Sequence, residues 1–167
     1  EKWSGAVVML IVEDSFVLIR RSYNMPSHKG QIGFMGGHRH KNENRPSDTA
    51  AREFYEESGF TPDRIEVLGL VEPVFTVKKK LIIPVVARFN GAKAEFMENV
   101  KSNGEWQNLV LVPITYLKGS QLWTTGLSLD HHYKIYFHPL LKSKCKYYRA
   151  PKKFAYVLWG ASAKMIV

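Results

Sequence analysis

One well-delimited helix, set among short β-branched runs, constrains the fold of this chain most. Pro46 and Ser47 supply a start signal, and the Ser47 hydroxyl is placed to cap free backbone amides. Gly59 supplies the stop, because glycine takes the left-handed conformation at a helix end without steric cost. We therefore expect a helix from Ser47 to Ser58 and mainly strands elsewhere.

Apolar, β-branched runs bounded by turn residues recur along the rest of the chain. Gly5–Val12 and Phe16–Arg20 flank Glu13-Asp14-Ser15 and are predicted to form a hairpin. Further strands are expected at Ile32–Met35, Arg64–Val71, Leu81–Phe89, Trp106–Val112, Tyr133–Phe137 and Phe154–Leu158, with a turn of helix after Pro113 and a terminal helix over Ala161–Val167. Many strands with one central and one terminal helix predict an α+β or layered α/β/α domain.

Length and composition place the chain in a broad class. Its 167 residues suit one domain over 1–167, and a chain of this size buries about two thirds of its unfolded surface. The one cysteine, Cys145, excludes an internal disulfide framework and fits a reducing compartment. The longest apolar stretch, Ala6–Val12, is far below the roughly 20 residues that cross a bilayer. With no signal peptide at the start, these features predict a cytoplasmic domain without a membrane partner.

The charge balance points to anionic partners. Lysine and arginine number 24 against 15 acidic residues, which gives a formal net charge of +9. Such a surplus favours nucleotides, phosphorylated metabolites, nucleic acid or an acidic membrane surface, and does not choose among them.

Three glutamates crowd one side of the expected helix. Glu53, Glu56 and Glu57 are i,i+3 and i,i+4 neighbours, a spacing at which like charges destabilise a helix. Arg52 is within reach of Glu56 but does not offset all three. The opposite sector, expected to face the core, holds Ala50, Ala51, Phe54 and Tyr55. One explanation is that a divalent cation that prefers oxygen ligands, Mg²⁺ or Mn²⁺, balances the negative charge of the three glutamates. The alternative is that they form an ordinary solvated acidic face.

The spacing around this helix resembles a known signature. Gly37 is followed after five residues by Glu43, and after eight more by Arg52-Glu53-Phe54-Tyr55-Glu56-Glu57-Ser58-Gly59-Phe60. The segment resembles the Nudix hydrolase signature, in which seven residues separate the glutamate from the arginine. The second half matches at every fixed position. The extra residue falls in a loop, where insertions are tolerated, and leaves the role of Glu43 open.

A second resemblance narrows the family. Arg20-Arg21-Ser22 and the run from Ser27 to Phe34 precede Gly36-Gly37 in a manner similar to the coenzyme A pyrophosphatase branch of Nudix enzymes. Later segments, Val74-Phe75-Thr76, Val112-Pro113 and Trp159-Gly160, are also similar to that branch. Met35 stands where the branch usually has proline, and residues 121–150 do not align with it.

These resemblances imply a Nudix-type α/β/α sandwich with a mixed sheet and a Mg²⁺- or Mn²⁺-dependent pyrophosphohydrolase. The implied substrate is coenzyme A or a thioester of it, cleaved to 3′,5′-ADP and 4′-phosphopantetheine. The implied metal ligands are Glu53, Glu56, Glu57 and the backbone of Gly36, with Arg52 orienting the glutamates. The general base stays open among Glu53, Glu57 and Glu105, with Glu98 as a weaker candidate. Arg21, His28 and Lys29 are expected to bind the anionic substrate.

Other readings of the sequence remain. If the chain is a Nudix hydrolase, the alternative substrates to coenzyme A are ADP-ribose, a nucleotide sugar and a nucleoside triphosphate. A non-catalytic Nudix module that binds a nucleotide or RNA is a second class, and a general nucleic-acid binder is disfavoured because no interleaved basic-aromatic motif occurs. Nudix proteins often form dimers, so a homodimer is a further expectation, although no interface is named by the sequence.

Overall fold

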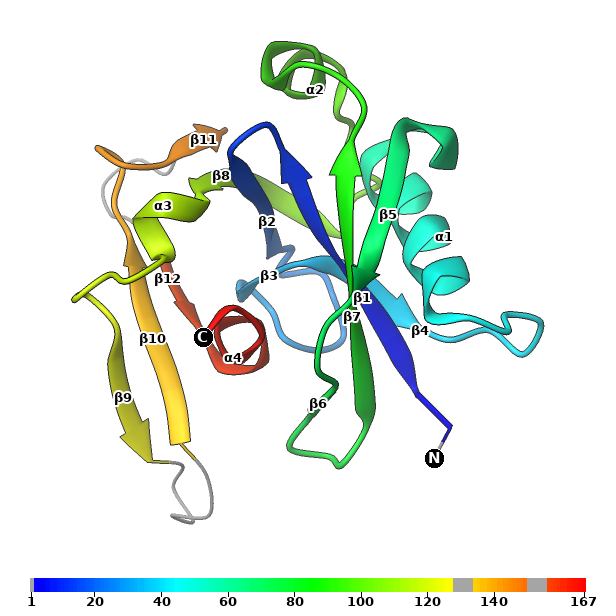
Figure 1. Ribbon diagram of the computed structural model, residues 1–167, viewed down its shortest axis with the longest axis horizontal. Helices are drawn as coiled ribbons and strands as arrows, with labels where there is room; N and C mark the ends of the chain where they lie inside the picture. Colours follow the sequence, from blue (N-terminus) through cyan, green and yellow to red (C-terminus); the bar gives the residue numbers. More distant parts are fainter. Residues whose placement is uncertain (1, 128–133, 150–155) are drawn as a thin grey trace.

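A nine-stranded mixed β-sheet forms the centre of the computed structural model, which describes residues 2–127, 134–149 and 156–167 (Figure 1). The main path runs β11-β8-β2-β1-β7-β5, while β3, β4 and β6 pair with β2, β1 and β7. The strands are β1 (Gly5–Val12), β2 (Ser15–Arg21), β3 (Ile32–Gly33), β4 (Met35–His38), β5 (Ile65–Leu70), β6 (Val74–Phe75), β7 (Leu81–Phe89), β8 (Trp106–Pro113) and β11 (Lys146–Tyr148).

The pairing of β1 makes the sheet mixed. β1 and β2 form the predicted antiparallel hairpin, with Ile11 opposite Phe16 and Val12 opposite Ser15. β1 also runs parallel to β7 from Gly5 to Ile11, and it pairs antiparallel with β4. The α+β expectation with a mixed sheet is therefore confirmed.

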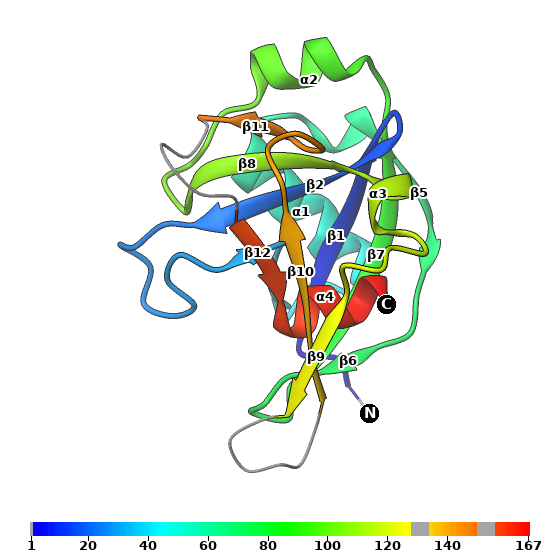
Figure 2. The same cartoon turned by 90° about the vertical axis from the view of Figure 1, so that its left-hand side faces the viewer.

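Helices cover the sheet on both sides (Figures 1 and 2). Helix α1 (Pro46–Ser58) lies against β1 and β4, and a short helix, α2 (Lys93–Asn99), follows β7. On the opposite side lie α3 (Ile114–Leu117), α4 (Gly160–Ile166) and a second sheet in the order β12-β10-β9, made of Tyr156–Trp159, Lys134–Leu140 and Thr124–Leu127. A 3₁₀ turn at Pro62–Arg64 leads into β5. None of the described helices has the length and apolar character needed to cross a membrane.

Alternation along β1 explains the layers. Val8 and Leu10 join Phe54 of α1 in one buried cluster, whereas Met9 belongs to a second cluster on the other face. That second cluster includes Leu158 of β12 and other residues of α3, α4 and β10. Because successive side chains of a strand point to opposite faces, one strand serves both cores.

Several boundaries differ from the sequence expectation. Helix α1 begins at Pro46, with Arg45 as its N-cap residue, so Ser47 lies inside the helix and its predicted capping role is wrong. Asp48 serves the helix start instead, since its carboxylate accepts a hydrogen bond from the Arg45 amide at 3.0 Å. Gly59 ends the helix with φ 79°, as expected.

Other differences concern strands. The run Ile32–Met35 is divided, because β3 pairs with β2 whereas β4 pairs with β1. Of the two late strands, Tyr133 and residues 154–155 lie outside the described residues, and the remaining positions fall in β10 and β12. Helix α2 and strands β9 and β11 were not predicted, since their short sequences carry weak periodicity.

Candidate active site

The inner side of α1 carries two carboxylates as well as apolar side chains. Glu57 is fully buried and Glu53 is 7% exposed, whereas Tyr55 is 51% exposed. The expectation that Tyr55 faces the core is therefore wrong, and Glu53 and Glu57 take part in the contact with the sheet. Glycine in β4 provides the room, because a Cβ at Gly37 would overlap the Glu53 carboxylate. A Cβ at Gly36 would lie 2.5 Å from the Ala6 carbonyl oxygen of β1.

Only one of the two carboxylate oxygens of Glu57 has a hydrogen-bond partner among the described residues. Its Oε2 accepts a hydrogen bond from the Gly36 amide at 2.8 Å, and its backbone carbonyl accepts one from Trp106 Nε1 at 2.6 Å. Oε1 is buried without a hydrogen-bond partner among the described residues. Burial, followed by the charges of Glu53 and Glu105, raises the pKa of Glu57 to about 9. A buried carboxylate with one free oxygen is set up for a cation.

Arg52 holds the carboxylates of α1 together with the preceding loop. Nε donates to Glu43 Oε1 at 2.5 Å, and Nη1 donates to Glu53 Oε1 at 2.8 Å and to Glu56 Oε2 at 3.2 Å. Nη2 donates to the carbonyl of His38, the last residue of β4, at 2.8 Å. The planar guanidinium has five N–H donors in fixed directions, which a lysine ammonium does not offer.

Glu43 has a structural role that the sequence left open. Its Oε2 accepts hydrogen bonds from Thr49 Oγ1 and, at 3.0 Å, from the His40 amide, while Oε1 binds Arg52. Burial acts to raise the pKa of Glu43, but the hydrogen bonds from Arg52, Thr49 and His40 outweigh it and lower the pKa to about 2. Glu43 is thus an ionised anchor for Arg52. The Gly-x5-Glu spacing was the signal for this residue, whereas nothing in the sequence singled out Thr49.

Arg21 and Glu105 meet the helix carboxylates from the sheet side. Arg21 ends β2 and pairs with Trp106 across a register shift, and Glu105 immediately precedes β8. The charge of Arg21 lowers the pKa of Glu57, while that of Glu105 raises it, so both lie within electrostatic reach. The Ser22 amide donates to the Glu105 carbonyl at 2.8 Å and joins the two segments. The structure therefore brings these two predicted site residues to Glu57.

His28 and Lys29 lie in the loop between β2 and β3, and both are exposed. His28 Nδ1 is 3.2 Å from Gln31 Oε1, and the backbone of His28 has φ 54°. Arg21 Nε donates to the Ser27 carbonyl at 3.2 Å, so the loop is attached to the same strand end. Binding of substrate by His28 and Lys29 stays a prediction.

The carboxylates suit a divalent cation in chemistry but are not gathered around one point. Among the residues that the structure describes, no three of His, Cys, Asp and Glu form a metal-binding group. Arg52 accounts for this, because its Nη1 binds both Glu53 and Glu56 and turns these oxygens toward itself. The partnerless Oε1 of Glu57 is the observation that fits a cation, and carboxylate oxygens are the ligands that Mg²⁺ and Mn²⁺ prefer.

Fold and site together define an α+β domain in which a helix presents buried carboxylates and an arginine at the edge of a mixed sheet. The chain belongs to the Nudix family: the family profile described as NUDIX domain matches residues 2–116. Members of this family generally use divalent metal ions.

Two curated relatives show the range of similarity. An uncharacterized Nudix hydrolase, NudL, of Pectobacterium atrosepticum is 36% identical over 72 residues, which is 43% of this chain and 38% of that protein. Nudix hydrolase 3 of Caenorhabditis elegans is 27% identical over 158 residues, covering 92% of this chain and 64% of that protein. The chain thus spans less than two thirds of the length of either relative.

Solved structures share the fold. An Ap4A hydrolase of C. elegans, crystallised as a binary complex, has a TM-score of 0.55 at 20% identity and covers 66% of this chain and 80% of its own. A MutT protein of Methanosarcina mazei Go1 has a TM-score of 0.54 at 23% identity, with 72% and 84% covered. At these identities the likeness shows the Nudix fold.

The contacts of Glu43 predict a pH-dependent contribution to stability. We expect Glu43→Gln to lower the free energy of unfolding by about 2 kcal/mol near neutral pH, since charged hydrogen bonds to Arg52, Thr49 and His40 are weakened. Because the pKa of Glu43 falls from 4.5 to about 2 on folding, this contribution is complete above pH 4.5 and is lost as the pH falls toward 2. Urea unfolding measured across this range checks it.

The exposed Glu72, on the segment between β5 and β6, provides the matched control. Glu72→Gln should leave stability nearly unchanged. An equal, pH-independent loss in both variants would contradict the assignment of Glu43 as an anchor.

Proposed function

We propose that this chain is a divalent-cation-dependent pyrophosphohydrolase that acts on a derivative of a nucleoside diphosphate. The observation that carries the proposal is the buried Glu57 carboxylate, whose Oε1 has no partner among the described residues and which lies beside Glu53. A structural carboxylate would be expected to have both oxygens hydrogen bonded, since an unsatisfied buried polar atom costs about 1–3 kcal/mol. Membership of the Nudix family supports the same chemistry.

Glu53, Glu56, Glu57 and the backbone of Gly36 are the proposed ligands for Mg²⁺ or Mn²⁺. A bound ion supplies neutralisation of phosphoryl charge and a lowered pKa for an attacking water. Glu56 has a 42% exposed side chain, and within the described part of the chain its carboxylate is hydrogen bonded to Arg52 alone, so it is free to turn toward Glu57 at small cost. Arg52 remains tied to Glu43 and to His38 through its other nitrogens, and holds the helix carboxylates in place.

Glu105 is the general base that we favour over Glu53 and Glu57. It lies within electrostatic reach of both glutamates, is half-exposed, and its side chain makes no hydrogen bond to the described residues. Its carboxylate is therefore available to accept a proton from water, whereas Glu53 and Glu57 are engaged by Arg52 and Gly36. Arg21, on the same side, is placed to bind a phosphate of the substrate.

Coenzyme A or a thioester of it is the proposed substrate, cleaved to 3′,5′-ADP and 4′-phosphopantetheine. Support comes from the similarity of Arg20-Arg21-Ser22 and of the loop that follows to the coenzyme A branch, and from the net charge of +9. The Ap4A specificity named for the C. elegans structure makes a dinucleoside polyphosphate an alternative, beside ADP-ribose, a nucleotide sugar and a nucleoside triphosphate. A non-catalytic nucleotide-binding module is the alternative from another class. The homodimer and the cytoplasmic location stay predictions.

The role of Glu57 predicts a loss of turnover without a loss of fold. Glu57→Gln should lower kcat at least about 100-fold, the scale seen when one preorganised electrostatic group is removed. Chelation by EDTA should abolish wild-type activity, and added Mg²⁺ or Mn²⁺ should restore it. Steady-state kinetics with circular dichroism measures both quantities.

Glu72→Gln, on the exposed segment between β5 and β6, is the control for this experiment and should keep full activity. If EDTA does not change kcat, or if Glu57→Gln has the kcat of the wild type, the proposed metal-dependent mechanism is wrong.

The assignment of Glu105 predicts a different kinetic change. Glu105→Gln should lower kcat by about 10²–10⁴-fold with little change in KM, because a general base acts in the chemical step. The pH profile of kcat should also lose its acidic limb. A profile that keeps this limb in Glu105→Gln would return the role to Glu53 or Glu57.

Substrate preference is tested with a panel in Mg²⁺: coenzyme A, dephospho-coenzyme A, ADP-ribose, Ap4A, a nucleotide sugar and nucleoside triphosphates, with products separated by chromatography. We expect coenzyme A to be preferred over its dephospho form and to yield 3′,5′-ADP. Preference for another member would retain the pyrophosphatase and reject coenzyme A. Binding without turnover of any member would favour the non-catalytic module.

A further inference from the structure

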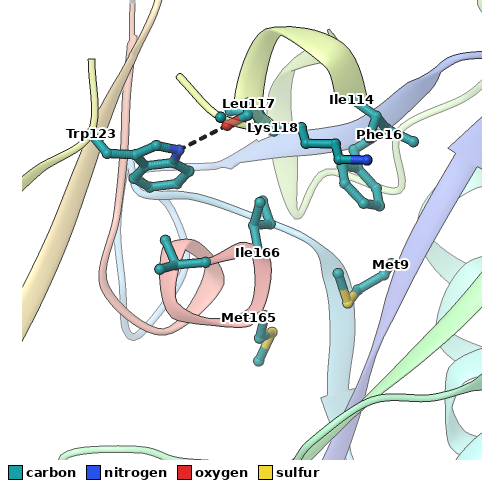
Figure 3. A pocket seen from close by; sticks show the side chains of 10 residues that line it. Met9, Phe16, Ile114, Leu117, Lys118, Trp123, Met165 and Ile166 are labelled. Carbon is teal, nitrogen blue, oxygen red and sulfur yellow. Dashed lines mark hydrogen bonds between the residues drawn. The ribbon is translucent and has the colours of Figure 1, made fainter. Parts of the chain in front are cut away.

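A cavity of about 450 Å³ lies on the side of the sheet opposite α1, between α3 and α4 (Figure 3). Its lining includes Met9 and Phe16 from the sheet, Leu117 and Trp123 from the region of α3, and Met165 and Ile166 from α4. None of the proposed catalytic or metal-binding residues lines it. The volume is within the range of about 300–1,000 Å³ that is typical of small-molecule sites.

The walls of this cavity are mainly apolar, with hydrocarbon and sulfur groups from most of the lining residues. The indole nitrogen of Trp123 donates to the Leu117 carbonyl at 3.0 Å, so this polar atom is already satisfied (Figure 3). The two methionines have flexible, polarizable side chains that adapt to ligands of different shape. An occupant must therefore have an apolar body.

Lys118 is the single charged side chain among the lining residues. It follows α3, is exposed, and its side chain extends toward Phe16 (Figure 3). No acidic side chain of the described residues forms an ion pair with Lys118. Lys118 thus offers one cation beside a mainly apolar lining, which also includes Val167.

We propose that this cavity is a second binding site, separate from the carboxylate site, for an amphipathic carboxylate with its apolar body inside and its anionic head on Lys118. A nucleotide is a poor match, because several phosphates would need more cations and base recognition would need free polar groups. A ligand of about 12 non-hydrogen atoms, at roughly the 30 Å³ that a water molecule takes for each, occupies less than the volume of this cavity. A medium-chain fatty acid meets all three conditions of charge, polarity and size.

The five methionines allow a direct test with decanoate as the probe. Met9 and Met165 line the cavity, whereas Met35 and Met97 belong to the core under α1 and Met25 lies in the loop between β2 and β3. In protein with ¹³C-labelled methionine methyl groups, decanoate below its micelle concentration should shift the Met9 and Met165 signals saturably. Shifts of all five methyl signals, or of neither Met9 nor Met165, would overturn the proposal.

Two variants test the chemistry of the site, with titration calorimetry and the same NMR signals as readouts. Lys118→Ala should weaken decanoate about fivefold, as expected for an exposed ion pair, and added salt should have a similar effect. The matched control, Lys78→Ala, removes an exposed lysine elsewhere and should change nothing. Equal affinity of the wild type for decanol and decanoate would show that Lys118 does not bind the carboxylate, and would contradict the proposal.

Ile166→Trp fills the cavity with a larger side chain and should abolish the shifts at Met9 and Met165. Pyrophosphatase activity of this variant shows whether the rest of the domain is intact. Undiminished binding of decanoate to a folded Ile166→Trp protein would contradict the location of the site.

Discussion

The arrangement of the site depends on how three carboxylates on one helix are kept together. Arg52 binds Glu53 and Glu56 through one nitrogen, and its other two nitrogens bind Glu43 and the His38 carbonyl. Glu43 is in turn held by Thr49 and by the His40 amide, so that the loop between β4 and α1 is fixed by the same arginine. Glu57 binds the Gly36 amide through Oε2, whereas its Oε1 has no partner among the described residues, and this oxygen is where the proposed cation has most to contribute.

The sheet contributes by bringing glycine next to these acids. β4 pairs with β1, and Gly36 fits against Ala6 and Val7 only because it has no side chain. Its amide then reaches Glu57, and Gly37 leaves space for the carboxylate of Glu53. Trp106 of β8 fixes the end of α1 through the Glu57 carbonyl. Strands far apart in sequence thus converge on two residues of one helix turn.

Much of this architecture was predictable from sequence, because its signals are local. Gly59 marks the end of α1, and the turn at Glu13-Asp14-Ser15 marks the hairpin. The helical periodicity placed Tyr55 in the core and the glutamates outside, since it weighs polarity alone. Glu56 is exposed as expected, but Tyr55 is exposed too, and Glu53 and Glu57 are buried against the glycine strand β4. The anchoring of Arg52 by Glu43 and Thr49 was not predictable, because it depends on the path of a loop with one extra residue. Of the second sheet, β10 and β12 were expected as strands, whereas the short strand β9 and the separation of these strands from the main sheet were not.

The central claim is that Glu57 and its neighbours hold a catalytic cation. Anomalous diffraction from crystals soaked in Mn²⁺ measures the position of such an ion directly. We predict one peak within coordination distance of Glu57 Oε1, with Glu53 and Glu56 turned toward it and the Arg52–Glu56 hydrogen bond broken. No peak at Glu57, in crystals of protein that hydrolyses its substrate with Mn²⁺, would contradict the account.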